Sequence, residues 1–223
     1  MFSKLKKQRR VETEPSLVER HFVLQDECPG HLREVEIEAL DPFLRNLLFT
    51  DGTVTRVLGA QTLAAIAVER LGQSPVEMSA RVAESLEAEA GEEAIRRRVR
   101  IGIDAPPIPV LWAESFLVPE RLPPGFLGLL DGAPGGIGQS LQRVSLESSR
   151  ELCWYGLDAA PEWAEAGTDA AEGTLHRQNR IVSAGQPAIL ISEHFAVARR
   201  SGVYHLAGLR AHESRHGQWE GAG

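Results

Sequence analysis

Cysteine is scarce in this sequence, and its scarcity excludes two common ways of stabilising a fold. The 223 residues include only Cys28 and Cys153, which lie far apart and form no CxxC or cysteine–histidine spacing. Neither a disulfide framework nor a cysteine-based zinc site is predicted, and we expect no metal and no cofactor. A reducing, cytoplasmic compartment is the expected location.

Long apolar runs and a secretory signal are also lacking. The longest apolar runs, such as 187–197, are too short to cross a bilayer and are interrupted by Ser192, Glu193 and His194. Residues 1–10 are basic, but no apolar stretch follows them. They predict a solvated tail rather than a signal peptide or a nucleic-acid-binding arm. No membrane partner is expected.

Positive charge is in deficit. The chain has 24 Lys and Arg against 31 Asp and Glu, a net charge of −7, and no basic stripe with interleaved aromatic residues. Because nucleic-acid binding depends on neutralising phosphates, nucleic acid is not an expected partner. A small anionic ligand is compatible with this balance, since one arginine or a few backbone amides can bind it locally.

The apolar content is sufficient for one compact core. Hydrophobic residues make up 43% of the chain, and this length favours a single domain over two. We expect a flexible N-terminal tail at 1–25, one domain at 26–206 and a C-terminal tail at 207–223. The sequence gives no indication of the oligomeric state.

Alternating apolar and polar residues predict two antiparallel strand pairs, 96–103 with 108–118 and 174–182 with 188–197. Each pair is joined by a short turn that contains proline. Segment 148–157 carries enough apolar mass for a further buried element.

Helical spacing of apolar residues predicts helices at 32–48, 125–130 and 139–144. Segment 54–70 predicts a covered strand, with helix as the alternative because of its alanines. Segment 74–93 is acidic and alanine-rich, which favours a surface helix or a mobile excursion. Together these elements indicate an α+β domain with an antiparallel sheet and helices packed on one side.

One carboxylate in the last predicted strand lies where a charge is costly. Glu193 shares the alternation of Ile189, Ile191 and Phe195, so we expect it on the apolar face. Such a group must be paired, protonated or directed into a polar cavity, where it could transfer a proton or bind a ligand hydroxyl. The alternative is a structural salt bridge to an arginine of a neighbouring strand, such as Arg180.

Other candidate positions are less specific. Glu114, between Ala113 and Ser115, is another carboxylate in a predicted strand that could meet a ligand. An ion pair with an arginine is again the alternative. The glycine-dense segment 133–138 predicts a loop whose amides could approach a ligand closely. No established catalytic motif, such as GxSxG, HExxH or a phosphate-binding loop, is present.

Four blocks of sequence, taken in order, resemble the chorismate lyase-like family, in the branch that includes the mycobacterial enzymes. They are RNLLFTDGTVTRVL at 45–58, AES within 112–117 with RLP at 121–123, IG at 137–138 with RE at 150–151, and the closing hairpin from 180–187 to 193–195. The resemblance covers about residues 40–200. It implies a single antiparallel sheet with helices on one side, a fold shared with the UTRA effector domains of bacterial transcription regulators.

The resemblance also implies which residues meet the ligand. In this family a glutamate of the last strand meets a ring hydroxyl, and Glu193 stands at that position. Backbone amides from two loops hold the ligand carboxylate, and the matching positions are Val54 and Ile137. Thr55 and Gly138 adjoin these amides and are expected to line the same site.

The family's carboxylate-binding arginine is replaced here by Ser115. Charge balance then requires another cation, for which Arg180 and Arg56 are the predicted candidates. Glu114, next to Ser115 in the AES block, is included among the expected substrate-binding residues.

The implied activity is a cofactor-independent carbon–oxygen lyase that converts chorismate to 4-hydroxybenzoate and pyruvate. One alternative is a non-catalytic binding domain for a small cyclic ligand, although the chain has little room for the DNA-binding domain that regulators carry. Another is a lyase for a relative of chorismate, suggested by Ser115 and by Leu111 and Trp112, whose indole could crowd the pocket.

Overall fold

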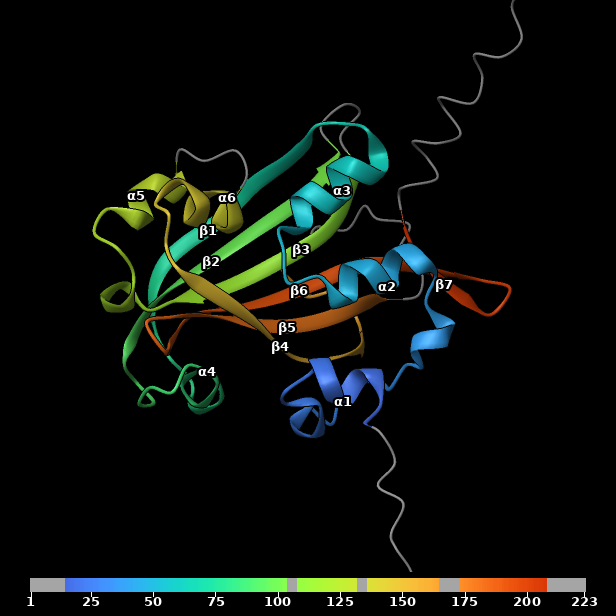
Figure 1. Ribbon diagram of the computed structural model, residues 1–223, viewed down its shortest axis with the longest axis horizontal. Helices are drawn as coiled ribbons and strands as arrows, with labels where there is room; N and C mark the ends of the chain where they lie inside the picture. Colours follow the sequence, from blue (N-terminus) through green and yellow to red (C-terminus); the bar gives the residue numbers. More distant parts are fainter. Residues whose placement is uncertain (1–14, 104–107, 132–135, 165–172, 208–223) are drawn as a thin grey trace, which may run out of the picture.

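A computed structural model of the chain describes residues 15–103, 108–131, 136–164 and 173–207. Its centre is one antiparallel sheet, in which six strands follow the order β1-β2-β3-β6-β5-β4 and β7 pairs with the C-terminal part of β6 (Figure 1). The strands are β1 (Ile66–Glu77), β2 (Glu93–Ile103), β3 (Ile108–Leu117), β4 (Ser148–Asp158), β5 (Thr174–Ser183), β6 (Gln186–Arg200) and β7 (Val203–Leu206).

Short helices connect and cover the strands. They are α1 (Leu17–His21), α2 (Pro42–Phe49), α3 (Val54–Thr62), α4 (Ala80–Ser85), α5 (Phe126–Asp131) and α6 (Gly136–Arg143), with single 3₁₀ turns at Gln25–Glu27, Ile37–Ala39 and Pro119–Arg121. The helix predicted over 32–48 begins only at Pro42. Asp41 caps it by accepting a hydrogen bond from the Leu44 amide at 2.7 Å, and proline is well suited to the first helical position.

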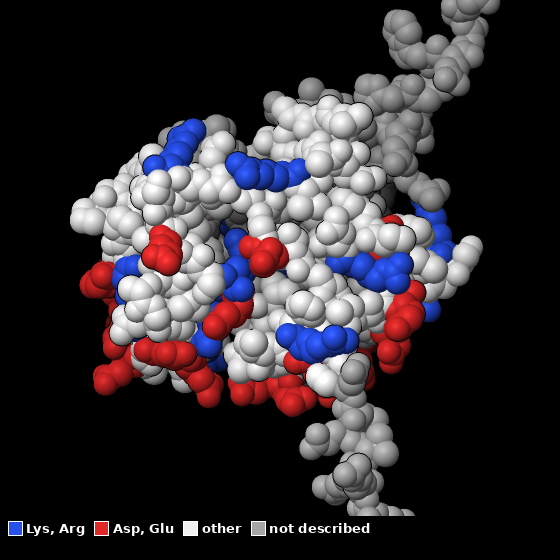
Figure 2. All heavy atoms as spheres, viewed as in Figure 1, with Lys and Arg blue, Asp and Glu red and all other residues white. Residues whose placement is uncertain are grey.

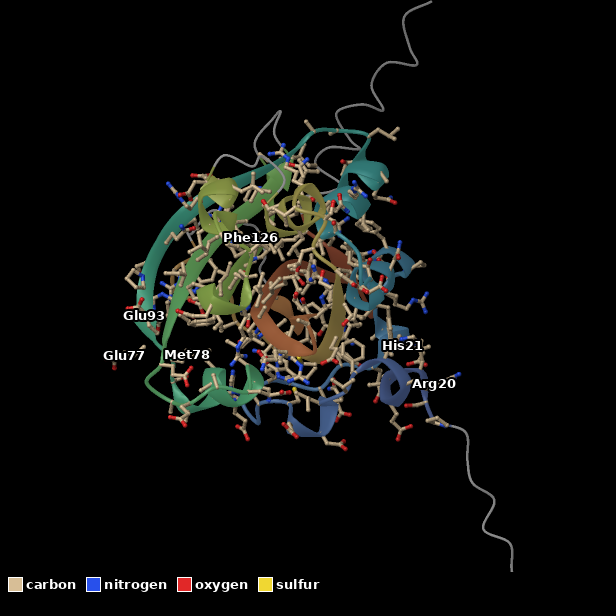
Figure 3. The ribbon with its side chains drawn as sticks, turned by 60° about the vertical axis from the view of Figure 1, so that its left-hand side comes forward. Arg20, His21, Glu77, Met78, Glu93 and Phe126 are labelled. Carbon is tan, nitrogen blue, oxygen red and sulfur yellow. The ribbon has the colours of Figure 1, made fainter. Side chains whose placement is uncertain are left out.

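The two faces of the sheet are covered differently. Helices α2, α3, α5 and α6 lie over one face, here called the front face, which carries Ile191, Glu193 and Phe195 of β6 (Figure 1). Phe126 of α5 points inward and is buried against this face (Figure 3). Helix α4 packs on the opposite, back face, where Leu86 meets Leu190.

The predicted fold class is confirmed: the chain has a single antiparallel sheet with a few helices. Both predicted strand pairs are present, as β2–β3 and β5–β6, and 148–157 is a strand. Segment 54–70 contains both the predicted strand and the helix alternative: β1 begins in its second half, at Ile66, and the first half is helix α3.

Segment 74–93 is a packed part of the domain rather than an excursion. It comprises the end of β1, helix α4 and the start of β2, and Met78, Ala83 and Leu86 are buried. Of the predicted glycine loop, only 136–138 lies within the described residues, where Gly136 begins α6 with φ +66°.

Part of the expected N-terminal tail is structured. Residues 15–25 include α1, and the buried Phe22 forms a bridge with Leu152 of β4. Residues 1–14 and 208–223 lie outside the described residues. Within the described ranges, no helix is long and apolar enough to cross a bilayer. Figure 2 shows acidic side chains along the lower margin of the molecule, around α1 and α4, in keeping with the net charge of −7.

Candidate functional site

A cavity lies between the front face of the sheet and the first turns of α3 and α6. It contains about 550 Å³ of space not filled by atoms. Its wall consists of Thr53, Val54, Thr55, Val68, Arg97, Val99, Ile101, Ala113, Ser115, Gly136, Ile137, Gly138, Arg150, Ile191 and Glu193. Most of this wall is apolar, so the few charged groups on it define what the cavity can bind.

Glu193 is held at the base of this cavity by three donors that all meet one of its oxygens. The Arg177 Nε donates to Oε2 at 2.9 Å, a second Arg177 nitrogen donates to the same atom, and Asn179 Nδ2 donates to it at 2.9 Å. The second oxygen, Oε1, has no hydrogen-bond partner among the residues described. Glu193 is 5% exposed and lines the cavity, so Oε1 is the atom available to a ligand.

Arg177 explains how a carboxylate is tolerated at this depth. The arginine is 0% exposed, and its Nη1 donates to the carbonyls of Leu47, Leu48 and Thr50 at 2.7, 3.1 and 3.0 Å. These carbonyls form the C-terminal end of α2, where a cation is favoured by the helix dipole. The partner of Glu193 is therefore Arg177, and the predicted Arg180 lies elsewhere.

Two arginines line the cavity without a direct ion pair to a buried acid, although the Glu193 carboxylate acts on Arg150 through space. Arg150 Nη1 donates to Asn179 Oδ1 at 2.5 Å, and no carboxylate of the described residues forms an ion pair with it. Arg97 donates to Gln73 Oε1 at 2.5 Å, and its nearest acid is the half-exposed Asp131 at 3.6 Å. Burial lowers the pKa of both guanidinium groups from their ordinary value. A cationic wall of this kind suits an anionic ligand.

The first turns of α3 and α6 both border the cavity. First-turn N–H groups have no acceptor inside their helix, and Thr53 makes no side-chain cap for α3. The two turns are in close contact, because a Cβ on Gly138 would lie 2.7 Å from Thr53 Oγ1. Amides from both helices are thus available to a negatively charged group, and the contact requires glycine at position 138.

A second hollow lies outside this helix contact and shares Thr53, Gly138 and Arg150 with the cavity. Arg56 lines this outer hollow, where its Nη2 donates to Gln142 Oε1 at 2.8 Å. Arg56, predicted as a ligand-binding cation, is therefore not on the inner cavity.

The structure brings six of the predicted site residues to the cavity and separates the others. Those on the cavity are Val54, Thr55, Ser115, Ile137, Gly138 and Glu193, and their roles stay predictions. Glu114 and Arg180 lie on the back face, where Glu114 accepts from Arg98 at 2.7 Å and Arg180 donates to Glu151 at 2.6 Å. The ion-pair alternative for Glu114 is the one observed.

Four polar residues of the site were missed by the sequence reasoning: Arg97, Arg150, Arg177 and Asn179. A signal existed for Arg97, which alternates in phase with Val99 and Ile101. In β4 the alternation is broken by a bulge between Leu152 and Trp154, which hides the direction of Arg150.

Trp112 also differs from expectation. It shares its register position with His194 and lies on the back face, 1% exposed, so its indole does not crowd the cavity.

The fold is an α+β domain built on one antiparallel sheet. A family profile described as "Chorismate pyruvate-lyase Rv2949c-like" matches residues 48–201, and the chain belongs to this family.

Curated relatives are similar at low identity. The chain is 28% identical over 166 residues to the chorismate pyruvate-lyase of Mycobacterium leprae (strain TN), covering 74% of this chain and 79% of that protein. It is 25% identical over 169 residues to the chorismate pyruvate-lyase of Mycobacterium tuberculosis (strain CDC 1551 / Oshkosh), covering 74% and 84%.

Among solved structures, the effector domain of PhnF from Mycobacterium smegmatis matches with a TM-score of 0.51 at 14% identity. The match covers 66% of this chain and 90% of that domain. At this identity the likeness shows the fold alone.

Proposed function

We propose that this protein is a chorismate pyruvate-lyase that converts chorismate to 4-hydroxybenzoate and pyruvate. The observation that carries the proposal is the polarity of the cavity: Glu193 directs one carboxylate oxygen without a hydrogen-bond partner into it, and two arginines that form no direct ion pair with a buried acid face the same space. Membership of the family supports the same reaction.

The substrate's charges match these groups. Chorismate carries a ring carboxylate, an enolpyruvyl carboxylate and a ring hydroxyl. Arg97 and Arg150, with the first-turn amides of α3 and α6, can bind the two carboxylates. Oε1 of Glu193 can accept the hydrogen bond of the ring hydroxyl, because its other oxygen is already saturated by Arg177 and Asn179.

The reaction needs no added atoms. The carbon–oxygen bond between the ring and the enolpyruvyl group breaks, the ring loses one hydrogen as it becomes aromatic, and the enolpyruvyl methylene gains one to become the methyl group of pyruvate. Intramolecular hydrogen transfer and acid/base elimination both satisfy this balance. In either case the protein contributes orientation, a largely apolar cavity and fixed charges.

Incubation of the purified chain with chorismate tests the proposal. We expect 4-hydroxybenzoate, measured by chromatography, and an equal amount of pyruvate, measured with lactate dehydrogenase. Glu193→Gln should lower kcat by about 100-fold, the lower range for loss of an acid/base group. Glu114→Gln, on the back face, is the matched control and should retain turnover. Absence of both products in the wild-type chain, or full turnover by Glu193→Gln, would contradict the assignment.

A non-catalytic binding domain is the second candidate, favoured by the fold shared with the PhnF effector domain. It predicts binding of 4-hydroxybenzoate or a related cyclic carboxylate with no release of pyruvate. A panel of chorismate relatives in the same assay would also detect a lyase with a different substrate.

A further inference from the structure

The back face of the sheet carries a second cluster of polar side chains, separate from the cavity. We propose that Asp158, His176 and His194 bind one divalent transition-metal ion of the Zn²⁺ type, and that His31 can supply a fourth ligand. This site is independent of the proposed lyase activity, because the sheet separates it from Glu193.

The three strands bring the ligands together by register. His176 of β5 and His194 of β6 are direct cross-strand partners, and their rings stack with centroids 3.9 Å apart. Asp158 ends the adjoining strand β4, and its Oδ2 lies 3.8 Å from His176 Nδ1. One donor atom from each of these residues lies within 4.8 Å of the others.

The imidazoles are buried without partners. His176 is 8% exposed and His194 is 7% exposed. Both ring nitrogens of His176 and Nδ1 of His194 have no hydrogen-bond partner among the described residues. Burying a polar nitrogen without a partner is unfavourable, so unpaired nitrogens on two adjoining rings point to a group that binds between them.

The chemistry of the donors selects a metal ion. An imidazole binds a metal ion through the lone pair of one ring nitrogen, and His176 and His194 each offer one such nitrogen to the cluster. Two neutral imidazoles and one carboxylate form a common Zn²⁺ ligand set. Binding would also give one nitrogen of each ring a partner.

His31 lies on the opposite side of the same carboxylate. Its Nε2 is 3.8 Å from Asp158 Oδ2, and its side chain is 65% exposed, so it can turn toward an ion. Arg33 bridges to Leu157 and holds this segment beside β4. Zn²⁺ bonds of about 2 Å require the donors to approach within about 3.5 Å of one another, which small side-chain rotations would achieve.

The expectation of a metal-free protein rested on cysteine spacing. That spacing has no bearing on a histidine–carboxylate set whose members are 18 residues apart on successive strands. Such a site would tie the segment around His31 to three strands of the sheet. Its expected role is therefore structural.

Metal titration of the chelator-treated, tag-free chain tests the site. Competition with a chromophoric chelator should show one Zn²⁺ bound per chain, and Co²⁺ should give the visible absorption of a low-coordinate complex with nitrogen and oxygen ligands. His176→Asn and Asp158→Asn should each weaken binding by at least about 100-fold, and His31→Gln by about 10-fold. His21→Gln is the matched control, because His21 is exposed at the end of α1 and does not belong to the Asp158 cluster (Figure 3).

Thermal unfolding separates loss of the site from loss of the fold. Saturating Zn²⁺ should raise the Tm of the wild-type chain and of His21→Gln, and should leave the Tm of His176→Asn unchanged. Circular dichroism without metal checks that each variant is folded; if His176→Asn fails this check, Asp158→Asn decides. Failure of the wild-type chain to bind one equivalent, or equal binding by the folded variants, would overturn the proposal.

Discussion

At the scale of single residues, the Arg177–Glu193 pair shows how this core accommodates charge. Both side chains are almost completely buried, and each has further hydrogen bonds: Glu193 from Asn179, and Arg177 to the end of α2. The pair therefore joins β5, β6 and α2. Its geometry leaves one carboxylate oxygen for the cavity, so Glu193 can form a structural ion pair and still offer an oxygen to a ligand.

Removing Arg177 should be strongly destabilising. We expect Arg177→Ala to lower the free energy of unfolding by about 3–5 kcal/mol, because it leaves a buried carboxylate and three carbonyls without their donor. The matched control is Arg70→Ala, which should cost less than about 1 kcal/mol because Arg70 and its partner Asp131 are both about half-exposed. Urea unfolding measures both, and similar losses for the two variants would contradict the role given to Arg177.

Arg150 is expected to matter for binding more than for folding. Arg150 hydrogen-bonds to the Asn179 amide rather than to a carboxylate, and a glutamine at this position can still donate to that amide, so Arg150→Gln should change stability little. The dissociation constant for 4-hydroxybenzoate should rise by about 10- to 100-fold, the effect of losing one charge-assisted hydrogen bond. Calorimetry measures this, with Arg56→Gln of the outer hollow as the control. An unchanged affinity in Arg150→Gln would remove Arg150 from the site.

At the scale of elements, the contact between α3 and α6 depends on a single glycine. Gly138 has no side chain where Thr53 Oγ1 and Cγ2 lie 2.7 and 3.0 Å from the position of a Cβ. Any side chain at 138 must push these first turns apart. The amides that both turns present to the cavity would move with them.

Gly138→Ala should therefore weaken ligand binding and lower stability by about 1–3 kcal/mol through overpacking. Combining it with Thr53→Ala removes the two closest atoms and should restore part of both losses. Gly128→Ala, where an added Cβ meets nothing within 4 Å, is the control. The wild-type chain, Gly138→Ala, Thr53→Ala and the double variant form a double-mutant cycle. Ligand titration and thermal unfolding of each measure it. If the losses of the double variant equalled the sum of those of the two single variants, the proposed contact would be contradicted.

Element prediction succeeded where alternation is regular and failed where two patterns overlap. Strands β2, β3 and β6 each have one face that is apolar along most of its length, so they could be predicted, and the turn between β5 and β6 indicated their hairpin. In 54–62 the β-branched residues hid a short helix, which begins after Thr53 and ends at the left-handed Leu63. Propensity was overridden by the tertiary contacts of Val54 and Leu58, which are buried in the core.

At the scale of the whole molecule, segment 74–93 packs on the back face of the sheet and does not cover the cavity. Helix α4 packs on the back face, and Arg121 donates to the carbonyls of Leu86 and Glu87. Arg180 donates to the carbonyl of Ser85. The sheet lies between this segment and Glu193.

Limited proteolysis should reflect this arrangement. We expect cleavage within 74–93 to be slow and unaffected by 4-hydroxybenzoate, because the segment is packed and does not touch the cavity. Mass spectrometry of timed digests, with and without ligand, measures it. Protection of this segment on ligand addition would show that it covers the site, and would revise its assignment to the back face.

The sequence by itself determined the strands with regular alternation and the direction of the side chains on them, which is why Glu193 was expected to point inward. Alternation is a local property, so it does not depend on which strands are neighbours. Only the tertiary structure decided the partners: Arg177 rather than Arg180 beside Glu193, and Arg97 and Arg150 on the cavity. Those choices depend on cross-strand register, on the bulge in β4 and on which helices cover the front face, and all three arise from contacts between distant segments.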